Sequence, residues 1–209
     1  MSGGDLSRPG QDEPAVQPLL DAARAEFERA GVRAATVHGI ARRAGIGRAT
    51  VYRRYPDKRS LVDAVVLRDV RAFLRYVDEH IGHIAAPSEQ VAECFVVVLT
   101  GLREHSLLNR LLALEPEETL PALTVHAGPA LALARGYVSD LLQHHQSAGA
   151  LPTFDAQPVA EVFVRIVHSA LLTPSGWMPD DDEAARAFAH TNLVPLLGDS
   201  SRAARTRPE

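Results

Sequence analysis

The stretch from Thr36 to Leu61 has the sequence TVHGIARRAGIGRATVYRRYPDKRSL. Its glycines and its proline interrupt the chain so often that only short helices fit before Pro56. Thr36 is a favourable N-cap, and Gly45 stands where a helix can end in a left-handed residue. A second short helix begins near Arg48 and is stopped by Pro56. The stretch therefore predicts two short helices joined by a tight glycine turn and followed at once by a third helix.

The rest of the chain also has helical periodicity. Alanine, leucine and valine dominate the apolar residues and aromatic residues make up only 5%, which favours helices over sheets. No strand pattern of convincing length is found. We therefore expect an all-α fold of about nine helices, while the segment 117–128 is ambiguous and compatible with a helical turn. The expected helices lie near 15–31, 36–45, 48–55, 58–81, 89–104, 106–116, 129–148, 156–172 and 182–197.

Composition divides the chain further. Residues 1–14 are rich in Gly, Pro, Ser and Asp, and we expect this tail and residues 198–209 to be disordered. Between the tails we expect a three-helix domain at 15–61 and a larger helical domain at 62–197.

Charge is distributed unevenly. The segment 16–68 holds eleven basic and five acidic residues, a balance of +6, while the rest of the chain holds 11 basic and 21 acidic residues, a balance of −10. A basic N-terminal segment on an acidic body indicates a single face that binds a polyanion. Two short helices with an arginine-rich second helix are what a helix-turn-helix needs to enter a DNA major groove.

Other features limit the classes of protein. Cys94 is the only cysteine, which excludes an intrachain disulfide and fits a cytoplasmic protein. No run of about 18 apolar residues predicts a membrane span. The group Glu79, His80 and His83 is interpreted as a solvated helix end, and no metal or other cofactor is expected. Because no catalytic motif is present, we do not expect an enzyme.

The spacing of several elements resembles that of the TetR family, the tetracycline-repressor-like regulators of bacteria. The resemblance is close from about Val16 to Val66 and weak in detail beyond it. The matching features are Ala23 and Phe27, Gly31, Thr36, the IAxxAG run from Ile40 to Gly45, the TVYRRYPDK run from Thr50 to Lys58, and Leu61.

The second helix of the motif presents candidate base-reading residues. Arg48 can donate two hydrogen bonds to a guanine, while Ala49 and the methyl group of Thr50 can contact a thymine methyl. Arg53 also projects from this helix toward solvent or DNA. His38, near the start of the preceding helix, is expected to reach the edge of the groove.

Other residues of the motif are expected to contact phosphates. Thr36, Tyr52 and Arg54 suit phosphate oxygens by their spacing and by the family resemblance. Lys58 stands in the first turn of the next helix, where its ammonium group and free backbone N–H groups can bind one phosphate together.

The resemblance implies that the larger domain encloses a small-molecule pocket and forms a homodimer. An apolar lining predicts an apolar or aromatic ligand. Its candidate residues are Phe73, Val77, Phe95, Leu99, Leu102, Leu111, Tyr137 and Leu141. Two apolar stripes near the C-terminus predict the dimer interface. Its candidates are Val159, Val162, Phe163, Ile166, Val167, Ala170, Phe188, Leu193, Val194 and Leu196.

These observations and the family resemblance favour a ligand-responsive transcriptional regulator, a repressor in preference to an activator, which binds a palindromic double-stranded DNA operator as a homodimer. The alternative is a helical protein-interaction module whose helix-turn-helix does not read DNA. Salt-dependent binding to DNA separates the two hypotheses.

Overall fold

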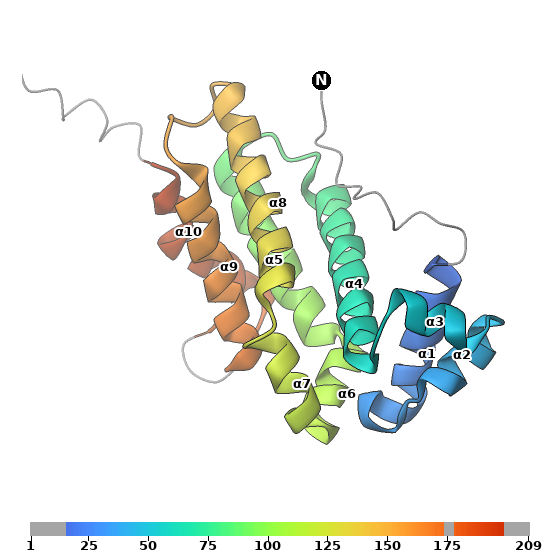
Figure 1. Cartoon of the computed structure of the whole chain (residues 1–209). Coiled ribbons are helices and arrows are strands. Elements are labelled where there is room, and N and C mark those ends of the chain that lie inside the picture. The colour runs from blue at the N-terminus through green and yellow to red at the C-terminus, as the bar shows by residue number, and fades with distance from the viewer. Residues whose placement is uncertain (1–15, 174–177, 199–209) are drawn as a thin grey trace, which may run out of the picture. The chain divides into compact units, whose positions relative to one another are not determined.

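The computed structural model describes residues 16–173 and 178–198, and the regular secondary structure of this part of the chain is helical only (Figure 1). The all-α expectation is confirmed. Apart from Gly198, the expected tails at 1–14 and 198–209 lie outside the described residues. The helices are α1 (Val16–Ala34), α2 (Val37–Ala44), α3 (Arg48–Arg54), α4 (Lys58–Ile81), α5 (Pro87–Glu104), α6 (Ser106–Leu114), α7 (Pro116–Leu123), α8 (Gly128–Ser147), α9 (Ala156–Leu172), α10 (Asp182–Asn192) and the 3-10 helix η1 (Val194–Leu197).

Two helices differ from the expectation. The ambiguous segment forms α7, which begins at Pro116. Glu117 and Glu118 lie in its first turn, where the positive end of the helix dipole stabilises carboxylates. The last expected helix is divided into α10 and η1, because Pro195 has no N–H to continue the α-helical ladder. The described residues therefore hold ten α-helices and one 3-10 helix instead of about nine helices.

The described chain forms two compact units. The first contains the residues up to Asp69 together with Arg110–Ala122, and the second contains Val70–Asn109 together with the residues from Leu123 onward. The division lies within α4, whereas the sequence suggests a boundary after Leu61.

The first unit is built around a small apolar core. Ile40 of α2, Val51 of α3 and Leu61 of α4 are completely buried, and they pack with Leu19 and Phe27 of α1. Each short helix therefore contributes a side chain to one common core, which explains why helices of seven and eight residues are stable here.

Glycine is required near the end of α1. Gly31 has φ 81° and ψ 166°, a conformation that only glycine adopts readily. A Cβ at this position would lie 2.0 Å from Oε1 of Glu115. The same carboxylate accepts a hydrogen bond of 3.0 Å from the backbone N–H of Arg33, so the absence of a side chain lets Glu115 reach the last turn of α1.

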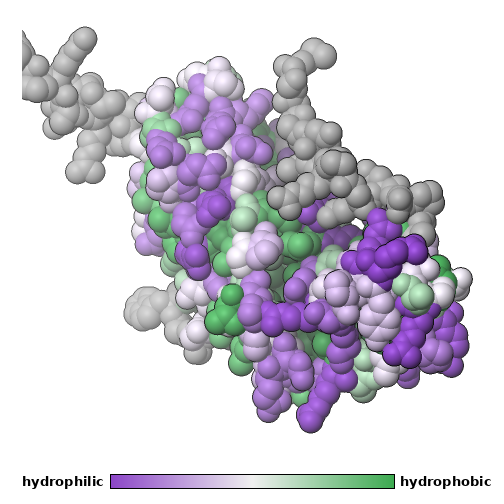
Figure 2. Space-filling model, in the orientation of Figure 1, coloured by the Kyte–Doolittle hydropathy of each residue, from purple (hydrophilic) through white to green (hydrophobic). Residues whose placement is uncertain are grey.

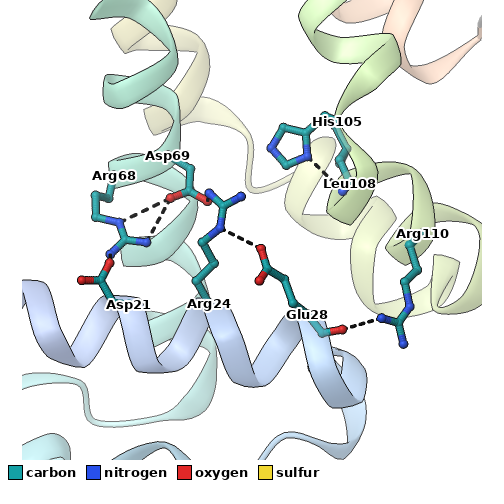
Figure 3. Close-up of polar contacts among 8 residues, drawn as sticks. All are labelled: Asp21, Arg24, Glu28, Arg68, Asp69, His105, Leu108 and Arg110. Carbon is teal, nitrogen blue, oxygen red and sulfur yellow. Dashed lines mark hydrogen bonds and ion pairs between the residues drawn. The ribbon is translucent and has the colours of Figure 1, made fainter. Parts of the chain in front are cut away.

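Ion pairs connect α1 to the first half of α4 (Figure 3). Arg68 pairs with Asp21 at 2.6 Å and with Asp69 at 3.2 Å. Arg24 pairs with Asp69 at 2.7 Å and with Glu28 at 2.9 Å. Asp69 therefore bridges two arginines from different helices. The backbone carbonyl of Glu28 also accepts a hydrogen bond from Arg110.

In the second unit, α5 packs against α9 and α10, and α8 packs against α9 (Figure 1). The rings of Phe95 on α5 and Phe188 on α10 are stacked with centroids 5.5 Å apart. In a second cluster, Val77 and Ile81 of α4 and Cys94 of α5 pack with Tyr137 and Leu141 of α8. Burial raises the pKa of the Cys94 thiol to about 12, so this side chain acts as an apolar filler.

A buried polar chain connects the end of α4 to α5 and α8. The amide nitrogen of Gln90 donates to the carbonyl of Ile81 at 2.8 Å, and the amide oxygen of Gln90 lies 2.5 Å from Nε2 of His145. Burial lowers the pKa of His145 from its usual value.

Within the described residues, none of the helices combines the length and apolar character that a bilayer-spanning segment needs.

Replacement of Gly31 by alanine should destabilise the protein by about 1–3 kcal/mol, because it forces a strained φ and a clash with Glu115. Urea denaturation followed by circular dichroism measures this change. Gly136→Ala is the matched control. Gly136 lies inside α8 with open space at its Cβ position, so alanine there should stabilise the protein by about 0.5–1 kcal/mol. Equal effects of the two substitutions would contradict the assignment of strain to Gly31.

Candidate nucleic-acid interface

Local hydrogen bonds define both ends of α2. Oγ1 of Thr36 accepts a hydrogen bond of 3.0 Å from the N–H of Gly39, which satisfies a free donor in the first turn. Gly45 has φ 69° and ends the helix, and the N–H of Ile46 donates to the carbonyl of Ala41 at 3.1 Å. The predicted glycine turn is confirmed. Thr36 is exposed, and its hydroxyl proton remains able to donate to a phosphate.

Helix α3 follows the turn with Gly47 as its N-cap and no side-chain capping bond. Val51 points into the core, which leaves the opposite face of the helix in solvent (Figure 2 shows hydrophilic surface over α2 and α3). The predicted DNA-contacting residues on this face divide by exposure. Arg48, Ala49, Tyr52 and Arg53 are exposed, Thr50 and Arg54 are half-buried, and His38 of α2 is exposed.

Arg48 and Tyr52 form a pair one helical turn apart. The guanidinium carbon of Arg48 lies 5.2 Å from the centroid of the Tyr52 ring, within the range of a cation–π interaction. Nη2 of Arg48 also donates to the Tyr52 hydroxyl at 3.4 Å. Arg48, the candidate for reading a base, therefore contacts Tyr52, the candidate for a phosphate contact, and both lie on one exposed face of α3.

Lys58 has partners that its sequence position does not indicate. Its ammonium group donates to the backbone carbonyls of Val32 at 2.9 Å, Arg33 at 3.1 Å and Ala35 at 3.4 Å. These carbonyls belong to the end of α1 and the loop after it, where a cation is favoured. Lys58 thus ties the start of α4 to the end of α1, and its phosphate contact stays a prediction.

The start of α4 is capped by Asp57, as its sequence position predicts. Oδ1 of Asp57 accepts a hydrogen bond of 2.7 Å from the N–H of Ser60, and Oγ of Ser60 accepts one of 3.4 Å from the N–H of Asp57. The hydrogen bonds from Ser60 lower the pKa of Asp57. The cap leaves Lys58 at the first helical position.

A basic hollow that the sequence analysis missed lies beside α2. It has a volume of about 420 Å³ and is lined by Glu26, Arg29, Gly39, Arg42 and Arg43. The buried carboxylate of Glu26 pairs with Arg29 at 2.5 Å and with Arg43 at 3.3 Å. Hydrogen bonds from Arg29 are the main cause of the lowered pKa of Glu26. Three arginines against one carboxylate leave this hollow with positive charge, which only the folded arrangement of α1 and α2 creates.

The candidate ligand-lining residues do not form one group. Val77 packs with Phe73, Tyr137 and Leu141 in the cluster between α4, α5 and α8. Phe95 and Leu99 belong instead to the core shared by α5, α9 and α10. Leu102 is half-buried in the second unit, and Leu111 is half-buried in the first.

The candidate dimer-forming residues also divide. Phe163, Ala170 and Leu193 are buried in the core of their own chain. Val162 and Leu196 are exposed, with 43% and 39% of their surface accessible. The remaining candidates are half-buried: Val159, Ile166, Val167, Phe188 and Val194.

Comparison with known proteins supports the fold and the DNA-binding class of the protein. Residues 19–65 match the model of the bacterial regulatory proteins of the tetR family. Residues 83–195 match the C-terminal domain of the bacterial tetracycline repressor, and this second match alone spans more than half of the chain. An uncharacterized HTH-type transcriptional regulator of Mycobacterium tuberculosis is 25% identical over 205 residues, which cover 98% of this chain and 96% of the relative.

Solved structures show the same fold. The TetR family repressor AlkX of Dietzia sp. gives a TM-score of 0.69 at 22% identity, over 90% of this chain and 97% of AlkX. RolR in complex with resorcinol gives a TM-score of 0.57 at 18% identity, over 93% of this chain and 94% of RolR.

Replacement of Lys58 by methionine tests its structural role. Loss of three hydrogen bonds from a charged donor should lower the free energy of unfolding by about 1.5–3 kcal/mol. The salt dependence of DNA binding should stay that of the parent. Unchanged stability would contradict the structural role of Lys58, and a fall of about one in the slope of log K against log salt would show that Lys58 also binds a phosphate. Arg59→Met, at the exposed neighbouring position, should change stability by no more than about 0.5 kcal/mol.

Proposed function

Because the chain belongs to the TetR family of bacterial transcriptional regulators, we propose that it is a repressor that binds a palindromic operator as a homodimer and releases it when a small molecule binds. The observation that carries this proposal is the exposed face of α3. Arg48, Tyr52 and Arg53 project from that face, and Val51 anchors it to the core.

The proposed mode of DNA binding follows from the geometry of a helix-turn-helix. The N-terminal residues of α3 enter the major groove, where Arg48 donates to the O6 and N7 atoms of a guanine. Two copies of α3 in one dimer contact half-sites about 34 Å apart. The exposed Thr36 hydroxyl and the arginines around the hollow beside α2 supply phosphate contacts.

The proposed dimer interface uses the exposed part of α9 and η1. Val162 and Ile166 lie on one face of α9, and Leu196 exposes a further apolar side chain. Burial of such residues in a two-fold interface is favourable, and a four-helix arrangement of two such chains is common. Phe163, Ala170 and Leu193 are buried in the core of their own chain, so in this proposal they do not contact the second subunit.

The proposed ligand response places the small molecule beside the cluster of Phe73, Val77, Tyr137 and Leu141. RolR, which shares the fold, has been crystallised with resorcinol. A ligand changes DNA affinity only if it binds the two conformations of the repressor with different affinities. Movement of α4 is the proposed link between the two activities, because this one helix contributes residues to both units.

Replacement of Arg48 by alanine should weaken binding to an operator selected from a random DNA pool by about 1–3 kcal/mol and should relax the base preference at one position of each half-site. Gel shifts at several salt concentrations measure both effects. Arg75→Ala, at an exposed arginine in the second unit, is the matched control and should bind like the parent. If the parent shows no salt-dependent DNA binding, the alternative of a protein-interaction module would be favoured.

Replacement of Val162 by aspartate should convert the proposed dimer into a monomer, because a buried unpaired carboxylate at an interface is strongly unfavourable. Sedimentation velocity measures the change. Val125→Asp is the control, since Val125 is 78% exposed and lies outside the proposed interface. A dimeric Val162→Asp variant, or a monomeric parent, would contradict the proposed interface.

A further inference from the structure

The side chain of Arg71 on α4 is half-buried, and its Nε has no hydrogen-bond partner among the described residues. Its Nε is buried, and among the described residues it is the one buried side-chain nitrogen or oxygen without a hydrogen bond. No described carboxylate forms an ion pair with Arg71, in contrast to Arg24, Arg68 and Arg186, which all have such partners. A buried N–H donor without an acceptor is unfavourable, and a bound water, ion or ligand group is one way in which native proteins satisfy such a donor.

The neighbouring charges on α4 do not compensate Arg71. Asp69 is the nearest carboxylate in the sequence, and it is already shared by Arg24 and Arg68. One turn before Arg71, Arg68 is paired with Asp21 and Asp69, and one turn after it, Arg75 is exposed to solvent. Because no described carboxylate pairs with Arg71 itself, its positive charge favours an anion beside it.

Helix register places Arg71 on the flank of α4 that contacts α8. Asp78 is seven residues further along, so it lies on the same flank and about 10 Å away along the axis. The hydroxyl of Tyr137 on α8 donates to Oδ1 of Asp78 at 3.4 Å. Burial raises the pKa of Tyr137, which keeps its hydroxyl protonated as a donor. The half-buried Leu74 lies on the same flank between the two polar positions.

We propose that Arg71 binds the carboxylate of a small organic acid, whose apolar body lies along the flank of α4 past Leu74 toward Tyr137. The effector of this regulator is then an organic monoanion with an aromatic or aliphatic body. This inference rests on the proposed ligand response and adds the charge of the ligand to the apolar character that the sequence predicts.

The charge balance favours a carboxylate over a phosphate. One guanidinium matches a single negative charge, and its planar donors suit a bidentate carboxylate. A phosphate monoester would bring a second negative charge. Arg68 is already paired with Asp21 and Asp69, and Arg75 is exposed to solvent, so neither arginine is placed to neutralise the second negative charge of a phosphate.

Calorimetry on the DNA-free protein tests the proposal with two pairs of probes of equal shape, benzoate against benzamide and octanoate against octanamide. We expect at least one carboxylate to bind with a Kd below about 1 mM and to bind at least about tenfold more tightly than its amide. Arg71→Gln should lose this discrimination. Arg75→Gln, which removes an exposed arginine one turn away, should keep it.

Two further measurements keep the result decisive. Arg71→Gln should fold with a thermal midpoint equal to or above that of the parent, because the substitution removes a buried N–H donor that has no described partner. Should that variant fail to fold, Arg71→Lys retains the charge without the planar fork, and we expect it to favour the carboxylate less strongly than the parent does. Equal binding of acids and amides, binding of neither acid, or undiminished discrimination in the Arg71 variants would overturn the proposal.

Failure of this inference can be distinguished from failure of the proposed function. The probe titrations contain no DNA, and the Arg48 gel shifts contain no ligand. A protein that binds its operator but prefers no carboxylate leaves the repressor proposal in place and removes the role of Arg71. A protein that prefers carboxylates and does not release DNA with them removes the proposed ligand response instead.

Discussion

The ammonium group of Lys58 holds together the two chain segments between which the DNA-reading helices lie. It donates to three carbonyls at the end of α1 and in the following loop, while Lys58 itself begins α4. Helices α2 and α3 are short and lie between these two fixed points, so their orientation depends on this contact and on the shared core of Ile40, Val51 and Leu61. The exposure of the α3 face follows, because Val51 can be buried in only one orientation of the helix.

The arginines of the basic N-terminal segment serve different purposes. Arg24 and Arg68 are neutralised by carboxylates of α1 and α4, and Arg29 and Arg43 share Glu26. Arg48 is exposed and rests on the Tyr52 ring. The net charge of the segment therefore overstates the positive charge that is available to DNA. In the folded protein, the available arginines lie on α2 and α3. Arg71 belongs to neither group, which is the reason for assigning it to a ligand.

Much of the fold could be predicted from local signals. The bounds of α4 follow from the cap at Asp57 and from Gly82, and both signals act within a few residues. The turn at Gly45 is equally local, since its left-handed φ favours glycine. The sequence pattern does not predict α7 as a full helix, because Pro121 in its interior lowers its intrinsic helical propensity. The candidate pocket residues were grouped by apolarity, which does not distinguish the α4–α5–α8 cluster from the α5–α9–α10 core.

By itself, the sequence determined the all-α class, the helix-turn-helix, the family and the exposed arginine face of α3, because these depend on residue spacing and on contacts within one or two helical turns. Only the tertiary structure decided which charges are used internally. It placed Lys58 on backbone carbonyls, put Glu115 beside Gly31, and left Nε of Arg71 buried without a partner. The physical reason is that the energy of a charge depends on its desolvation and on partners that are distant in the sequence, and both exist only after the helices have packed.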